Sequence, residues 1–176
     1  ALFMVALAAV PEQKNGQKPL VLMPNPFYQV YLGAAVTAGA EPVLVPADRQ
    51  NGFLPNYAAL PDDILARTAL AYYCSPANPQ GAIAPMETMK QLVELARAHD
   101  FVLVSDECYS ELYYGDPPTG AAEAAAALGD IDKGAMKNVV AMNSLSKRSS
   151  APGLRSGFVA GDADLIRRFA RLRDYG

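Results

Sequence analysis

A lysine and an arginine, Lys147 and Arg155, stand close together in a short polar stretch, residues 143–157 (NSLSKRSSAPGLRSG). Small hydroxyl side chains, among them Ser144 and Ser146, surround the lysine, and a Pro-Gly turn precedes the arginine. A lysine in such surroundings is suited to forming a Schiff base with an aldehyde. A guanidinium fork suits a phosphate dianion, and a serine hydroxyl adds a further donor. The stretch therefore predicts a site for a ligand that carries both an aldehyde and a phosphate.

Three further polar residues, Asn78, Asp106 and Tyr109, could complete that ligand's site. An aspartate beside a pyridine nitrogen keeps the nitrogen protonated, because an opposite charge stabilises the cationic form. Asn78 and Tyr109 could donate to a phenolic oxygen on the same ring. The ligand that combines an aldehyde, a phosphate, a phenolic oxygen and a ring nitrogen is pyridoxal 5′-phosphate (PLP). We therefore expect PLP as the cofactor and expect no metal.

Each of these residues also has an ordinary structural explanation when it is taken alone. Asn78-Pro79 is a common turn former, and Asp106 could cap a following helix. Lys147 could be a solvated surface lysine, and Arg155 could pair with a surface carboxylate. The functional interpretation depends on the fold bringing all of them to one place.

The hydrophobic pattern predicts elements that would do so. Short apolar runs that read as strands fall at 19–23, 42–46, 69–74, 101–105, 138–142 and 156–160. Most of them are continuous rather than alternating, which is typical of strands covered on both faces. Helices are predicted at 30–39, 86–99 and 163–173 from apolar residues at helical spacing. Residues 115–135 are predicted to form a surface loop with a short helix.

Alternating strands and helices indicate an α/β three-layer sandwich with a mostly parallel sheet. Ligands of such sheets bind at the carboxyl ends of the strands. Asn78 follows the run at 69–74, Asp106 and Tyr109 follow 101–105, and Lys147 follows 138–142. Three strands should therefore deliver these side chains to the same edge.

Composition gives no sign of another class of function. The chain has 176 residues, 51% of them hydrophobic, and a net charge of -3, which offers no general attraction to nucleic acid or acidic membranes. The two cysteines, Cys74 and Cys108, lack metal-ligand spacing and lie beside apolar runs, so we expect buried free thiols. With no apolar run long enough for a membrane span, we expect a cytoplasmic protein.

At these residues the sequence resembles the fold-type I, class I/II aminotransferases. The pattern "SLSK" followed by "PGLRSG" is similar to that family's Schiff-base lysine and phosphate-binding arginine. "NPQG" resembles its asparagine turn, and "SDECYSELYY" its aspartate-x-x-tyrosine element. Within the family the sequence most resembles the bacterial succinyldiaminopimelate aminotransferases of lysine biosynthesis. The resemblance implies that Tyr28 stacks on the cofactor ring, although a tyrosine there could also simply anchor its loop.

The resemblance also implies what lies outside this chain. Family members are considerably longer, with a Gly-Ser phosphate loop expected before Ala1 and a small domain that binds the substrate carboxylate expected after Gly176. Residues 1–176 would then be a partial large PLP-binding domain of the aspartate aminotransferase-like fold. Two positions depart from the usual pattern, Gln80 where threonine is common and Ser150 where asparagine is common. Family members are usually homodimers with active sites at the subunit interface, so we expect a dimer.

The implied activity is transamination between glutamate and a 2-oxo acid, with N-succinyl-2-amino-6-oxopimelate as the expected acceptor. In it Lys147 would act as the general base that moves the substrate's Cα proton, and Asp106 would keep the ring cationic. Two alternatives use the same residues: another PLP enzyme of this fold, such as a different aminotransferase or a C–S β-lyase, and a non-catalytic PLP-binding regulator domain.

Overall fold

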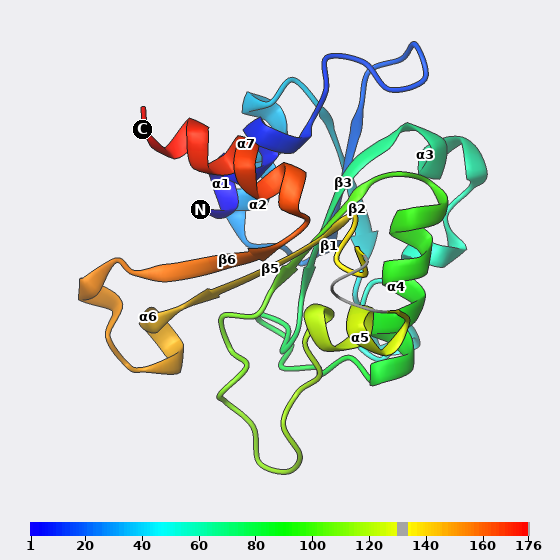
Figure 1. Cartoon of the computed structure of the whole chain (residues 1–176). Coiled ribbons are helices and arrows are strands. Elements are labelled where there is room, and N and C mark those ends of the chain that lie inside the picture. Colours follow the sequence, from blue (N-terminus) through cyan, green and yellow to red (C-terminus); the bar gives the residue numbers. More distant parts are fainter. Residues whose placement is uncertain (130–133, 176) are drawn as a thin grey trace.

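Six strands form one sheet in the order β2-β1-β3-β4-β5-β6 in the computed structural model, which describes residues 1–129 and 134–175 (Figure 1). The strands β1 to β5 run parallel, and β6 is antiparallel to β5. The strands are β1 Leu20–Asn25, β2 Glu41–Pro46, β3 Thr68–Cys74, β4 Val102–Asp106, β5 Val139–Ser144 and β6 Gly157–Gly161. All six runs predicted as strands are confirmed, with ends shifted by one or two residues.

Helices cover both faces of the sheet, as predicted. One face carries α1 Leu2–Ala9, α2 Gln29–Thr37 and α7 Ala163–Arg173. The other carries α3 Asp62–Arg67, α4 Met86–Ala98 and α5 Ala121–Ala127 (Figure 1). A one-turn helix, α6 Leu145–Arg148, follows β5. No helix in the described residues is long and apolar enough to cross a membrane.

Each covered strand divides its side chains between two cores, because successive residues point to opposite faces. On β3, Leu70 and Tyr72 pack with α1 and α2, whereas Ala71 and Tyr73 pack on the side of α4 and α5. Every residue of β3 is buried. This two-sided burial explains why the strand sequences are continuously apolar and do not alternate.

Three short helices, α1, α3 and α6, were not predicted from the pattern. Helix α1 is apolar all round, so it lacks the periodic polar face that reveals a helix, and Val5 and Ala6 are fully buried. In the segment 115–135 the predicted short helix is α5, and it packs Ala121, Ala124 and Ala125 into the core. The part of that prediction at 130–133 lies outside the described residues.

Asp162 joins the end of the sheet to α7. Its carboxylate accepts hydrogen bonds from the backbone N–H groups of Asp164 and Leu165 at 2.9 and 3.1 Å, which caps α7. It also accepts one from Asn138 N at 2.9 Å, just before β5. Partial burial alone would raise the pKa of Asp162, but these three donors outweigh it and the pKa is lowered.

Replacing Asp162 by Ala removes all three acceptor contacts, and we expect the free energy of unfolding to fall by about 1–2 kcal/mol, the usual cost of a lost N-cap. Because the carboxyl pKa is lower in the folded state, this contribution is present above the ordinary aspartate range. It disappears as the pH falls through the folded-state value. Urea unfolding at neutral and acidic pH measures both effects. Asp162→Asn, which keeps an acceptor, is the control; an Ala variant as stable as wild type at neutral pH would contradict the assignment.

Candidate active site

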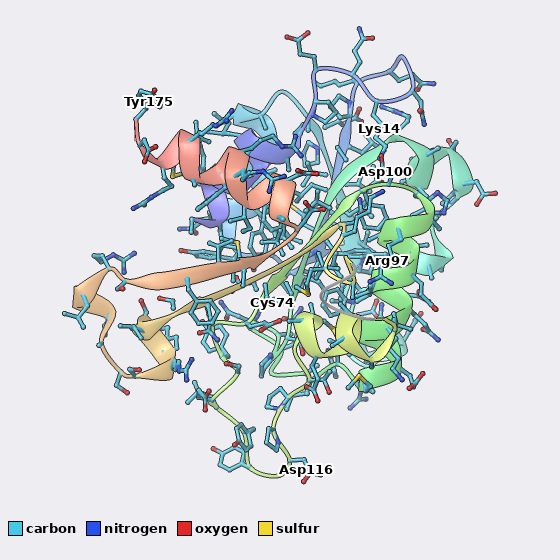
Figure 2. The ribbon with its side chains drawn as sticks, viewed as in Figure 1. Lys14, Cys74, Arg97, Asp100, Asp116 and Tyr175 are labelled. Carbon is cyan, nitrogen blue, oxygen red and sulfur yellow. The ribbon has the colours of Figure 1, made fainter. Side chains whose placement is uncertain are left out.

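The pairing register places the carboxyl ends of three strands level with one another. Cys74 at the end of β3 pairs with Asp106 at the end of β4, and Asp106 pairs with Met142 of β5. Figure 2 labels Cys74 near the middle of the molecule, where these strands meet. The residues that follow the three strands therefore start from one edge of the sheet, as the sequence predicted.

Asp106 is the only charged residue among the buried polar side chains of the described chain, with 4% of its surface exposed. Its Oδ2 accepts a 2.6 Å hydrogen bond from the Tyr31 hydroxyl, and its Oδ1 accepts the Cys108 backbone N–H at 3.3 Å. A buried charge without such partners would be strongly unfavourable. Asp106 does not cap a helix of its own, since the chain after β4 forms turns.

A cluster of three tyrosines lies beside Asp106. Tyr31 and Tyr72 stack, with ring centroids 4.4 Å apart and planes 12° apart. Tyr28 meets Tyr31 edge to face at 5.8 Å and is 41% exposed. The predicted stacking residue Tyr28 therefore has a ring partly open to a ligand, and it is held next to the aspartate through Tyr31.

Asn78 and Tyr109 lie in the loops that follow β3 and β4. Asn78 is exposed, and a hydrogen bond from its backbone to the Cys74 thiol at the end of β3 opposes the rise in the pKa of that thiol. Tyr109 is partly buried, and burial together with the nearby Cys74 raises its pKa. Both predicted residues thus lie at the edge of the sheet that Asp106 occupies.

Both cysteines are free thiols, as expected, and they also surround Asp106. Burial, and then the Asp106 charge, raise the pKa of Cys74 to about 12, and the same two causes raise that of Cys108. Cys74 Sγ donates to the Pro76 carbonyl at 3.2 Å. Cys74 is buried and Cys108 partly so. Both thiols stay protonated at neutral pH and are not nucleophiles.

The residues 143–158 form an arm that projects beyond the rest of the sheet, with α6 near its far end (Figure 1). Asn143 Nδ2 donates to Ser110 Oγ at 2.9 Å, which ties the arm to the loop after β4. Ser144 Oγ lies 2.9 Å from Ser146 Oγ and accepts the Ser146 backbone N–H at 3.1 Å. The two predicted serines thus form one hydroxyl pair at the start of α6.

Lys147 and Arg155 are both exposed on the arm. The positive charge of Lys147 acts weakly on the pKa of the Cys108 thiol in the loop that follows Asp106. Arg155 Nη1 donates to the Pro152 carbonyl at 3.0 Å. Within residues 1–129 and 134–175, neither cation forms a hydrogen bond or ion pair with Asp106. A ligand that joins them would have to span the distance between the arm and the strand ends.

The donor set fits PLP. Asp106 offers an oriented, buried carboxylate for a ring nitrogen, and Tyr28 offers a partly open aromatic face. On the arm, an exposed amine, an exposed guanidinium and a pair of hydroxyls match an aldehyde and a phosphate. The described residues contain no cluster of three or more His, Cys, Asp or Glu that could hold a metal ion.

Tyr31, Tyr72 and Asn143 belong to this site but were not singled out from the sequence. Tyr31 reads as one more apolar-face residue of a helix, and Tyr72 as one more residue of a buried strand. The sheet register, which places β3 next to β4, brings Tyr72 near Asp106, and the packing of α2 on the same face brings Tyr31 to it.

Gly157 sets how closely the two strands of the arm approach. A Cβ built on Gly157 would overlap the carbonyl oxygen of Asn143 and crowd Ser144 Cα. Gly157 pairs directly with Ser144 across β5 and β6. A side chain here would push β6 away from the strand that carries the serines and the lysine.

Gly157→Ala is expected to separate the arm locally and to weaken binding of PLP, with a smaller effect on global unfolding because the arm lies at the edge of the sheet. Titration of PLP fluorescence measures the affinity, and thermal unfolding measures the stability. Gly153→Ala, where a Cβ meets nothing within 4 Å, is the matched control. Equal affinities for the two variants would contradict the role given to Gly157.

Comparison with known proteins agrees with this geometry. The model of the class I and II aminotransferase family matches residues 6–175. An LL-diaminopimelate aminotransferase from Moorella thermoacetica is 34% identical over 152 residues, which is 86% of this chain and 37% of that protein. The chain therefore belongs to the class I and II aminotransferases, a family that uses pyridoxal 5′-phosphate.

Solved structures of aminotransferases have the same fold. An aminotransferase from Neisseria meningitidis superimposes with a TM-score of 0.88 at 38% identity, over 99% of this chain and 43% of that one. A probable N-succinyldiaminopimelate aminotransferase from Thermus thermophilus gives a TM-score of 0.82 at 29% identity, over 99% and 43%. The predicted fold class and family are confirmed. The chain spans less than half the length of each of these relatives.

Proposed function

We propose that the chain is the PLP-binding part of an aminotransferase large domain, as the resemblance implied. The observation that carries this proposal is the buried, doubly hydrogen-bonded Asp106 at the level where β3, β4 and β5 end. Bound there, PLP would supply an electron sink for the carbanion formed when an amino acid loses its Cα proton. Asp106 would hold the ring nitrogen as a cation.

Lys147 is proposed to anchor the cofactor and then to act as the general base for the substrate's Cα proton. Its position supports this role, since it is exposed on the arm that follows β5, the strand next to the one that ends at Asp106. Nothing in the described chain neutralises it through a salt bridge. The amine is therefore available to a ligand held between the arm and the strand ends.

The remaining predicted residues are proposed to orient the cofactor. Arg155 and the Ser144–Ser146 pair would bind the phosphate, Asn78 and Tyr109 the phenolic oxygen, and Tyr28 the ring face. Arg155 is exposed on the same arm as the two serines, which supports this assignment.

For the reaction we propose transfer of an amino group between glutamate and N-succinyl-2-amino-6-oxopimelate. The name of the Thermus thermophilus relative supports this substrate, whereas the Moorella thermoacetica relative is named for LL-diaminopimelate. Both names describe an amino group on a seven-carbon dicarboxylate, so that class of substrate has the stronger support. The same arrangement leaves a C–S β-lyase or a regulator domain as alternatives.

We also propose a cytoplasmic homodimer. Leu154 and Phe158 on the arm are 68% and 50% exposed, and apolar side chains beside a binding site favour coverage by another part of the assembly.

Lys147→Ala is expected to abolish the visible absorbance band that the purified protein develops with PLP, because the amine that binds the aldehyde is gone. Absorbance spectroscopy before and after borohydride reduction measures this. Lys90→Ala removes another partly exposed lysine, one paired with Glu87 on α4, and should leave the band intact. A band of unchanged intensity in Lys147→Ala would refute the assignment.

Activity assays separate the proposed reactions. With the intact protein, glutamate-dependent amination of the succinylated oxo acid should exceed both LL-diaminopimelate transamination and release of pyruvate and ammonia from cystathionine. A higher rate with LL-diaminopimelate would correct the substrate, and lyase activity alone would correct the reaction. PLP binding without turnover of any of the three would favour the regulator domain.

A further inference from the structure

Tyr31 donates a short hydrogen bond from α2 to the Asp106 carboxylate. The hydroxyl lies 2.6 Å from Oδ2, and the whole tyrosine is only 1% exposed. Cys108 also contacts the carboxylate, through its backbone N–H on Oδ1 at a longer 3.3 Å and through its side chain. Rotation of the carboxylate about its Cβ–Cγ bond is therefore limited mainly by Tyr31.

Tyr31 is itself fixed on several sides. Its ring stacks on Tyr72, and the Tyr72 hydroxyl donates to the Leu2 carbonyl in the first turn of α1 at 2.8 Å. Its other neighbour is the half-exposed Tyr28, which packs edge to face against it. A rigid chain of contacts thus runs from α1 through Tyr72 and Tyr31 to Asp106.

The Tyr31 hydroxyl is a permanent donor. Burial and then the Asp106 charge raise its pKa far above the ordinary tyrosine value, so it stays protonated at every pH at which the protein is folded. A neutral donor that cannot ionise is suited to orienting a carboxylate without competing for its charge.

We propose that Tyr31 is a positioning residue that holds the Asp106 carboxylate in the orientation required to pair with the cofactor's ring nitrogen, with Tyr72 as its brace to α1. The proposal rests on the proposed PLP site. Without the hydroxyl, the carboxylate turns more freely, its pairing with the ring nitrogen weakens, and the nitrogen loses part of its positive charge.

The test is Tyr31→Phe in the protein loaded with ¹⁵N-labelled PLP, with the ¹⁵N chemical shift as the reporter of ring protonation. We expect a pyridinium-type resonance in wild type and a resonance displaced toward neutral pyridine in the variant. The affinity for PLP should also fall about tenfold, as expected when a hydrogen bond to a charged group is lost.

Tyr57→Phe is the matched control. Tyr57 is fully buried, and its hydroxyl donates to the Tyr72 carbonyl at 2.5 Å from the opposite face of the sheet. This variant should lose stability by a similar amount and leave the ¹⁵N resonance unchanged. Should Tyr31→Phe not fold, Tyr72→Phe keeps the ring stack but releases Leu2, and it should move the resonance in the same direction by less.

The outcomes distinguish failure of the positioning role of Tyr31 from failure of the proposed PLP site. A wild-type pyridinium resonance that is unchanged in Tyr31→Phe, or in Tyr72→Phe where only that variant folds, would overturn the positioning role and leave the PLP site standing. Equal displacement in Tyr31→Phe and Tyr57→Phe would show a purely structural effect and also overturn it. A wild-type protein that holds no PLP would overturn the proposed function, and the inference with it.

Discussion

The parallel register between β3, β4 and β5 is the constraint on which the site depends. It sets Cys74, Asp106 and Met142 side by side, so the loops that follow these strands begin at one level. A slip by one residue in β4 would turn Asp106 to the other face of the sheet, away from Tyr31 and into the core beneath α4 and α5. The two-sided apolar burial of the strands makes such a slip costly, and it therefore protects the position of the carboxylate.

The burial of Asp106 strengthens its interaction with a cationic ligand and also makes hydrogen-bond donors to its carboxylate necessary. A carboxylate in low dielectric interacts strongly with a cation placed beside it, because little water screens the pair. The same burial would destabilise the fold if the charge had no donors. Tyr31 and the Cys108 N–H meet that requirement from α2 and from the loop after β4. The complementary cations remain on the exposed arm, so the charges approach each other only through what binds between them.

Much of this arrangement was predictable from the sequence because it rests on local patterns. The six apolar runs, the amphipathic helix α4 and the polar residues after each strand indicated the sheet, its helical cover and the edge at which the side chains meet. Asn78, Asp106 and Tyr109 lie at the strand ends where those patterns placed them, whereas Lys147 lies on the projecting arm, and the roles of all four in binding stay predictions. The family resemblance added the cofactor-ring role of Tyr28, which no local pattern indicates.

Other features depended on contacts between residues far apart in sequence and could not be predicted. Tyr31 and Asp106 are 75 residues apart, and their hydrogen bond exists only because α2 packs across the end of β4. Helix α1 has no polar face to reveal it, and the close approach of Gly157 to Asn143 follows from the antiparallel turn of β6. Hydrophobic periodicity predicts none of these three features, because it indicates which face of an element is buried and not which residues pack against that face.

The proposed function requires that one lysine, Lys147, holds the cofactor. Borohydride reduction of the protein with PLP, followed by proteolysis and mass spectrometry of the peptides, tests it most directly. We expect a phosphopyridoxyl group on Lys147, and we expect no other lysine to carry it in substantial yield. Labelling spread over Lys14, Lys90 and Lys137, or confined to any of them, would contradict it.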